Sequence, residues 1–121
     1  MTVLRSSIIA LVACAMVASG AIAASAAQAN APVTITAANW KFAPAESTVH
    51  VGQPVTLDLT STEGVHGLAS DDLGLAATTI MPGRTKSVTF TPKKAGTFVL
   101  HCTIPCGPGH GKMTLTVHVV A

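Results

Sequence analysis

Residues 97–119 read Thr97-Phe-Val-Leu-His-Cys102-Thr-Ile-Pro-Cys106-Gly-Pro-Gly-His110-Gly-Lys-Met113-Thr-Leu-Thr-Val-His-Val119. The two flanks of this stretch, 97–101 and 113–119, alternate apolar with polar residues, a pattern typical of half-buried β-strands. The residues between them form a loop that holds two cysteines and a histidine and runs up to a methionine. Two consecutive strands joined in this way place their loop at one end of a rigid β-structure, where functional loops are commonly built.

The same alternation recurs along the chain and predicts a protein made of strands and turns. Further strands are expected at 33–37, 47–51, 55–60 and 87–91. Glycine and proline punctuate the intervals between strands, and no segment after residue 32 sustains a capped helical stripe. The predicted fold is therefore all-β, a Greek-key β-sandwich of antiparallel strands whose inner faces carry the alternating Val, Leu, Ile and Phe residues.

The first part of the 121-residue chain differs from this pattern. Arg5 is its only charge, residues 8–24 are apolar and rich in alanine, and residues 25–31 are small and polar. This order is typical of a secretory signal peptide, with Ala27-Gln-Ala29 as the cleavage motif. We predict a signal peptide over 1–29 and one domain over 30–121. Acylation of Cys14 and retention of the segment as an anchor stay open as alternatives.

Charge and compartment limit what the predicted domain can do. It carries six lysines and arginines against five acidic residues, a net charge of about +1. This balance does not favour nucleic acid or an acidic membrane surface as a partner. Export implies a periplasmic or secreted protein in an oxidising environment, where Cys102 and Cys106 have a structural disulfide as an alternative. A bridge over so short a loop would stabilise little and would not explain the spacing of His110 and Met113.

The loop donors are soft, and their spacing is Cys-x3-Cys-x3-His-x2-Met with nothing acidic between them. Thiolate and thioether ligands favour copper, whereas a methionine sulfur disfavours zinc, which takes Cys, His or carboxylate. A zinc ribbon needs a second cysteine pair, and c-type haem attachment needs Cys-x-x-Cys-His; the chain has neither. The loop therefore predicts a copper site.

A second histidine is expected at the same end of the sandwich. His66 follows the predicted strand 55–60 and its turn, and we place it in a loop that reaches the site. His50 and His118 lie on the polar phase of predicted strands and are expected at the surface. His101, next to Cys102, is expected to point to the opposite face unless the strand has already ended there, and it is left out of the ligand set. Trp40, the only tryptophan, is expected in the core, with a place near an electron path as the alternative.

Several segments together resemble a known family over about residues 33–120. They are Val65-His66-Gly-Leu, Met81-Pro-Gly-Arg-Thr, Val88-Thr-Phe-Thr-Pro, Ala95-Gly-Thr-Phe and the loop 102–113. They look like the copper-binding domain of cytochrome c oxidase subunit II, a cupredoxin. The resemblance implies a binuclear, mixed-valence CuA centre. In it Cys102 and Cys106 bridge two coppers, His66 and His110 each bind one, and the sulfur of Met113 and the carbonyl of Ile104 are weak outer ligands.

Two departures from the family pattern are expected to matter. The family commonly has an acidic or amide side chain at the position of Ile104, so any contact made through that side chain is lost, while the carbonyl ligand remains. Subunit II also carries transmembrane helices ahead of the domain, where this chain has only the predicted signal peptide. We therefore expect a free-standing, exported relative with no membrane span after cleavage.

The expected function is electron transfer by a monomer, with a cytochrome c or a terminal oxidase or reductase as partner. Saturated, protein-enclosed ligation leaves no open position for a substrate, so we do not expect an enzyme. Two alternatives stay open. One is a mononuclear blue or red copper site built from Cys106, His110, Met113 and His66. The other is a periplasmic chaperone that delivers copper to an oxidase.

Overall fold

The structure, a computed structural model, describes residue 20 and residues 30–121. The predicted signal peptide therefore lies outside the described residues except for residue 20, and so do its cleavage motif and Cys14. Among the residues that are described, no helix is long and apolar enough to cross a membrane.

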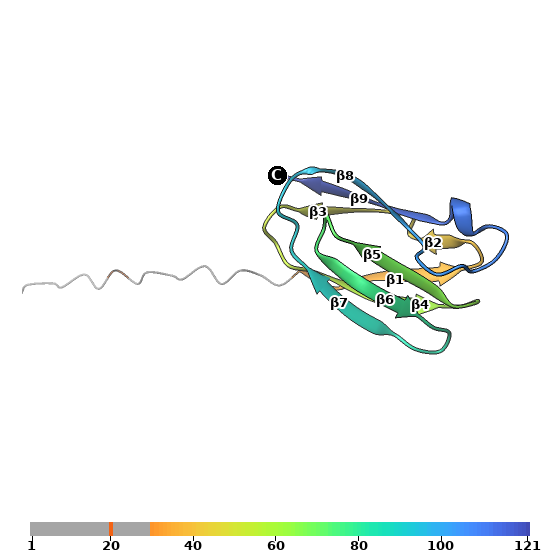
Figure 1. The fold of residues 1–121 in the computed structure, drawn as a ribbon. Coiled ribbons are helices and arrows are strands. Elements are labelled where there is room, and N and C mark those ends of the chain that lie inside the picture. Colours follow the sequence, from red (N-terminus) through yellow and green to blue (C-terminus); the bar gives the residue numbers. More distant parts are fainter. Residues whose placement is uncertain (1–19, 21–29) are drawn as a thin grey trace, which may run out of the picture.

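The described residues form strands joined by short turns, with one turn of 3₁₀ helix (Figure 1). In chain order the elements are β1 (Val33–Ala38), β2 (Lys41–Ala43), β3 (Glu46–His50), β4 (Val55–Ser61), β5 (His66–Ser70), β6 (Leu75–Ile80), β7 (Lys86–Phe90), β8 (Gly96–His101), η1 (His110–Lys112) and β9 (Thr114–Val120). The all-β prediction is confirmed. Each of the six strands expected from alternation is present to within one or two residues at its ends.

The strands form two main sheets and a hairpin. One sheet has the order β2-β1-β4-β7, the other has the order β3-β9-β8, and β5 pairs with β6. Figure 1 shows β3, β9 and β8 layered over β1, β4 and β7. The expectation of antiparallel strands was wrong for two pairs, because β1 with β4 and β3 with β9 are parallel. The chain crosses from the first sheet to the second between β2 and β3, so β4 returns beside β1 in the same direction.

The core lies between the two sheets and follows the period-two pattern. Alternate residues of β4 are buried from Val55 to Ser61, and alternate residues of β9 are buried from Leu115 to Val119. Leu57 and Leu59 of one sheet and Leu115 and Val117 of the other belong to one apolar cluster. Full burial of each such side chain is worth about 1.5–3 kcal/mol. The sandwich is thus held chiefly by this shared apolar layer.

Four connecting segments meet at one end of the sandwich, which we call the loop end. They are the β1–β2 turn with the start of β2 (39–41), the β4–β5 turn (62–65), the β6–β7 turn with the start of β7 (81–86), and the loop before β9 (103–112). Ser61 bridges to Pro82, and His66 pairs with Ile80, so the second and third segments are neighbours. The opposite end carries the turns 51–54, 71–74 and 91–95.

Trp40 lies at the loop end, and its predicted place in the core was wrong. It is 38% exposed, and its indole N–H donates to the carbonyl of Cys106 at 2.9 Å. A Cβ atom added at Gly109 would lie 2.5 Å from Trp40 Cγ, so the glycine backbone passes directly against the indole. The indole sits in a turn beyond the edge of the sheets, and the apolar layer is filled instead by Phe42.

We expect Gly109→Ala to lower the free energy of unfolding by about 1–3 kcal/mol, because the added methyl overlaps the indole. Gly111→Ala is the matched control, since a Cβ there meets nothing within 4 Å, and it should change stability by less than about 0.5 kcal/mol. Denaturant unfolding of the metal-free protein measures both. In a protein that already carries Trp40→Ala, adding Gly109→Ala should lower the free energy of unfolding only slightly further, because the indole is gone. Equal losses from the two glycine variants would contradict this packing.

Candidate metal centre

The pairing of β8 with β9 brings the two ends of the loop together. His101 is opposite Thr114, and in the next pair the Cys102 N–H donates a backbone hydrogen bond to the carbonyl of Met113 at 3.1 Å. Both of these side chains point into the core, where Cys102 is 4% and Met113 0% exposed. The alternation of both strands therefore continues one residue into the loop and buries a thiol beside a thioether.

After Cys102 the loop leaves β9 and runs along β5. Thr103 N–H donates to the carbonyl of Gly67 at 3.1 Å. Gly67 has no room for a side chain, because a Cβ atom there would lie 2.2 Å from Thr103 Oγ1. This close approach of two backbones places Cys102 beside His66, the residue that precedes Gly67.

The second half of the loop folds back through η1. His110 N–H donates to the carbonyl of Gly107, and Met113 N–H donates to the carbonyl of His110. The turn sets His110 Nδ1 3.5 Å from Cys106 Sγ, and Met113 Sδ lies 3.8 Å from the same sulfur. One thiol thus faces an imidazole and a thioether.

The two thiols are free and lie side by side, with 3.6 Å between their sulfur atoms. Cys102 Sγ lies 3.9 Å from His66 Nδ1 and 3.3 Å from the carbonyl oxygen of Ile104. Each thiol therefore has one imidazole nitrogen and one weaker donor beside it. The structure brings together all six residues that the sequence predicted for the site.

His66 differs from its prediction in one respect: it is the first residue of β5 rather than part of a loop, and it is fully buried. Its Nε2–H donates to the carbonyl of Glu63 at 2.7 Å. A carbonyl can only accept, so Nδ1 is left unprotonated toward Cys102. A partner that fixes the tautomer of a ligand histidine in this way is typical of metal sites.

The Glu63 carbonyl is itself held by a residue that the sequence analysis missed. Ser61 is buried at the end of β4, and its hydroxyl lies 3.0 Å from the Glu63 carbonyl oxygen and 2.7 Å from that of Gly64. These contacts fix the β4–β5 turn that presents the carbonyl to His66. A hydroxyl at an inward-facing position of a strand was the available signal, since such a group needs a hydrogen-bond partner.

No carboxylate contributes to the cluster, and burial governs its electrostatics. Burial raises the pKa of the Cys106 thiol, and the hydrogen bond and charge of Cys102 raise it further, against a smaller lowering by a backbone hydrogen bond. In the metal-free protein this thiol is therefore protonated at neutral pH. Metal binding must release its proton, because the thiolate is the ligand.

The other histidines lie outside the cluster, as expected. His50 and His101 are exposed, and His118 lies on an outer strand face 3.5 Å from Glu46. The tightest group is His66, Cys102 and Cys106, whose ligand atoms all lie within 4.8 Å of one another. His110 and Met113 approach from the far side of Cys106. Thiol, imidazole and thioether donors with no oxygen-rich side chain suit copper.

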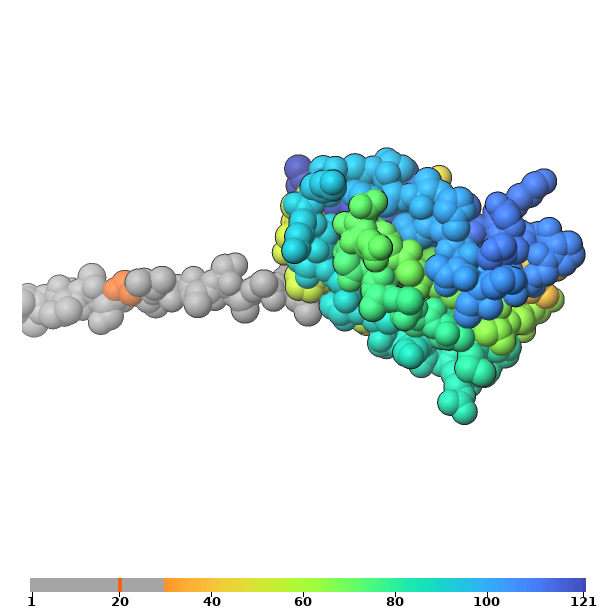
Figure 2. Space-filling view, in the orientation of Figure 1, coloured from red at the N-terminus to blue at the C-terminus, as the bar shows by residue number. Residues whose placement is uncertain are grey.

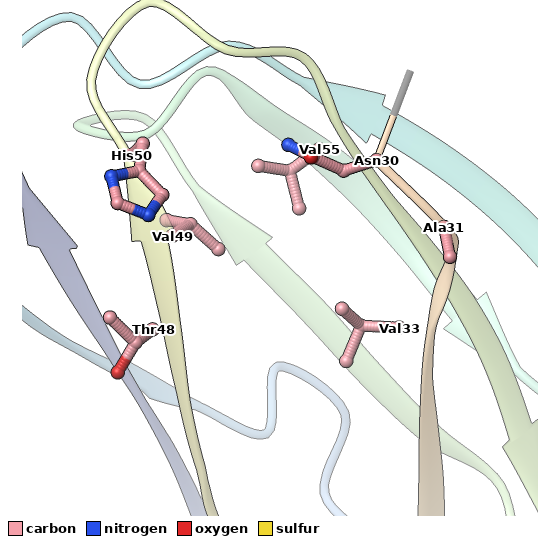
Figure 3. Close-up of a pocket in the computed structure, with 7 residues that line it drawn as sticks. All are labelled: Asn30, Ala31, Val33, Thr48, Val49, His50 and Val55. Carbon is pink, nitrogen blue, oxygen red and sulfur yellow. The ribbon is translucent and has the colours of Figure 1, made fainter. Parts of the chain in front are cut away.

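A separate hollow of about 180 Å³ lies at the opposite end of the sandwich (Figure 3). It is lined by Asn30, Ala31, Val33, Thr48, Val49, His50 and Val55. None of the predicted donors lines it, and His50 is its only titratable side chain. The candidate metal donors therefore all lie at the loop end, away from this hollow.

Known structures share this fold. The periplasmic domain of cytochrome oxidase subunit II from Bradyrhizobium japonicum superimposes with a TM-score of 0.68 at 20% identity, over 77% of this chain and 86% of that one. A subunit II of cytochrome c oxidase, in a mixed disulfide with a thioredoxin-like protein, superimposes with a TM-score of 0.64 at 18% identity, over 82% of this chain and 87% of that one. Auracyanin from Roseiflexus castenholzii gives 0.58 at 24% identity, over 78% and 100%.

A family model described as a cupredoxin-like domain matches residues 7–115. This match spans most of the sequence and includes every residue of the cluster, and the described architecture agrees with it. The chain belongs to the cupredoxin-like domain family.

Proposed function

We propose that this protein is an exported electron carrier with a binuclear copper centre. Cys102 and Cys106 bridge the two ions, and His66 and His110 each bind one. The Met113 sulfur and the Ile104 carbonyl are the weaker outer ligands. Bound copper supplies a one-electron couple, and sharing the electron between two thiolate-bridged ions lowers the reorganisation that each transfer requires.

One observation carries the proposal: two free thiols 3.6 Å apart, each with its own imidazole Nδ1, at 3.9 Å for Cys102 and 3.5 Å for Cys106. A mononuclear site needs only one thiolate and would leave the second buried without a metal. The paired arrangement supports two ions that share both sulfurs.

Burial supports a carrier rather than a chaperone or an enzyme. His66, Cys102 and Met113 are all at most 4% exposed. A chaperone passes its metal to an incoming ligand and needs exposed donors, and a catalytic metal keeps an open position for substrate. The other three candidate ligands, Ile104, Cys106 and His110, are only partly exposed, and a soft site buried to this extent suits a copper that changes oxidation state and stays in place.

The same comparisons support a compartment and a class of partner. The subunit II domain of Bradyrhizobium japonicum is periplasmic, and with the signal-like residues 1–29 this supports export to the periplasm. A cytochrome c or a terminal oxidase or reductase is the proposed redox partner of the monomer. A thioredoxin-like protein, found bonded to a subunit II domain, is a further partner that would keep Cys102 and Cys106 reduced.

The protein should bind two coppers per chain, because two bridging thiolates have room for two ions. Elemental analysis of reconstituted protein measures the ratio, and the EPR spectrum should show one unpaired electron spread over both nuclei. A ratio that stays at one copper, with a single intense thiolate absorption band, would support the mononuclear alternative instead.

Cys102→Ser should convert the protein to a one-copper form with its fold intact. The contacts of Cys106 with His110 at 3.5 Å and Met113 at 3.8 Å do not involve Cys102. Cys106→Ser is the matched variant and should lose more copper, because it removes the thiol that both donors face. Visible absorption and copper content compare the two. Retention of the parent spectrum by Cys102→Ser would remove this residue from the site.

Met113→Leu should keep both coppers and shift the redox potential, because thioether is a weak ligand and leucine has similar volume. His110→Ala removes a strong donor that nothing in Gly107-Pro-Gly109 can replace, and should weaken copper binding by more than about 100-fold. Competition with a Cu(I) chelator measures both affinities. Equal weakening of copper binding in the two variants would show that His110 is not the stronger ligand and Met113 not the weaker one.

A further inference from the structure

The loop end combines exposed apolar side chains with an excess of positive charge. Trp40, Val65 and Met81 are 38%, 40% and 45% exposed, and they come from three of the four segments that meet there. Figure 2 shows these segments on the right-hand side of the molecule, with the blue ligand loop above the yellow-green and teal turns. Two other large apolar residues of the described chain, Val99 and Val120, are exposed on strands away from this end.

The charges around this apolar centre are mostly of one sign. The loop end has one exposed acid, Glu63, and four exposed cations. The cations are Lys41, Arg84, Lys86 and Lys112. None of these five residues takes part in an ion pair within the described part of the chain. They are therefore free to act on an approaching molecule.

The rest of the domain does not share this sign. At the opposite end the charges balance, with two acids, Asp71 and Asp72, and two lysines, Lys93 and Lys94. The remaining acids, Glu46 and Asp58, lie in strands. The near-neutral net charge of the domain therefore conceals an uneven distribution. Positive potential is concentrated where the metal donors lie.

A hollow at this surface adds a specific feature. It has a volume of about 270 Å³ and is lined by Thr79, Met81, Arg84, Thr85 and Lys86. Two cations at the mouth of a cavity beside an apolar side chain suit an acidic side chain of a partner. The surface also adjoins the donors, since Val65 precedes His66 and Trp40 donates to the Cys106 carbonyl.

We propose that the loop end is the docking surface for a redox protein whose own docking face is apolar at its centre and acidic at its rim. This inference rests on the proposed electron transfer and names the partner class. Docking there would bring the partner's own one-electron group close to the copper that His66, Cys102, Cys106 and His110 would hold, and a single electron would pass with no bond made or broken. Basic partners are repelled, because complementary charge speeds encounter and like charge slows it.

Stopped-flow kinetics with two c-type cytochromes, one acidic and one basic, tests the sign of the charge. The copper-loaded parent should react faster with the acidic cytochrome at low salt, and salt should slow that reaction. Lys41→Gln/Arg84→Gln should slow it by about tenfold, whereas Lys93→Gln/Lys94→Gln, which changes net charge equally, should change it by less than about twofold. Faster reaction with the basic cytochrome, or equal slowing in both double variants, would overturn the proposal.

Two further measurements separate this proposal from the copper chemistry. An uncharged hydroquinone should reduce the copper centre of both double variants at the parent rate; failure of the copper to cycle would contradict electron transfer itself. NMR titration of the metal-free protein with the acidic cytochrome should shift the signals of Trp40, Val65 and Met81. Unmoved signals, or binding to anionic phospholipid vesicles in preference to the cytochrome, would refute the docking surface.

Discussion

The antiparallel pairing of β8 with β9 is the constraint on which the site depends. It runs in continuous register from Gly96 opposite Val119 to His101 opposite Thr114. The backbone hydrogen bond from Cys102 to Met113 extends the pairing by one residue on each strand. Because this register buries every second residue of β9, it also determines that Met113 and Cys102 face inward. A slip of β9 by one residue against β8 would turn the side chains of β9 to the other face, so Met113 would leave the side on which Cys102 lies and the donor set would be broken. The same ladder that builds the sheet therefore selects two of the ligands.

The second half of the site depends on a different contact, between the loop and β5. Gly67 allows the backbone of Thr103 to approach, and this approach carries His66 to Cys102. Ser61 and the Glu63 carbonyl then orient the imidazole. The centre thus joins the sheet that contains β8 and β9 to the β5–β6 hairpin. A metal bound by donors from both would stabilise their packing as well as its own coordination.

Alternation predicted the strands that have one face in the core and one in solvent. Spacing along the loop predicted four candidate donors, and the structure brings their side chains together. Alternation did not predict β2, which has three residues, or β5 and β6, which are rich in Gly, Ala, Ser and Thr and lack strong apolar contrast. His66 was therefore placed in a loop. Trp40 was placed in the core because large aromatic side chains are usually buried, and no local pattern indicates that Gly109, far along the chain, would pass against it. Such contacts depend on tertiary structure and not on sequence period.

The donor cluster forms as part of the apolar core, with Cys102 and Met113 members of the same cluster as Leu100 and Leu115. In the described residues every buried side-chain nitrogen and oxygen atom has a hydrogen-bond partner. The packing and backbone hydrogen bonds that order the loop therefore also bring the candidate donors together. What metal binding still requires is loss of thiol protons, which burial and the neighbouring thiol oppose at Cys106 by raising its pKa. Copper held by Cys106 as a thiolate would therefore release a proton on binding.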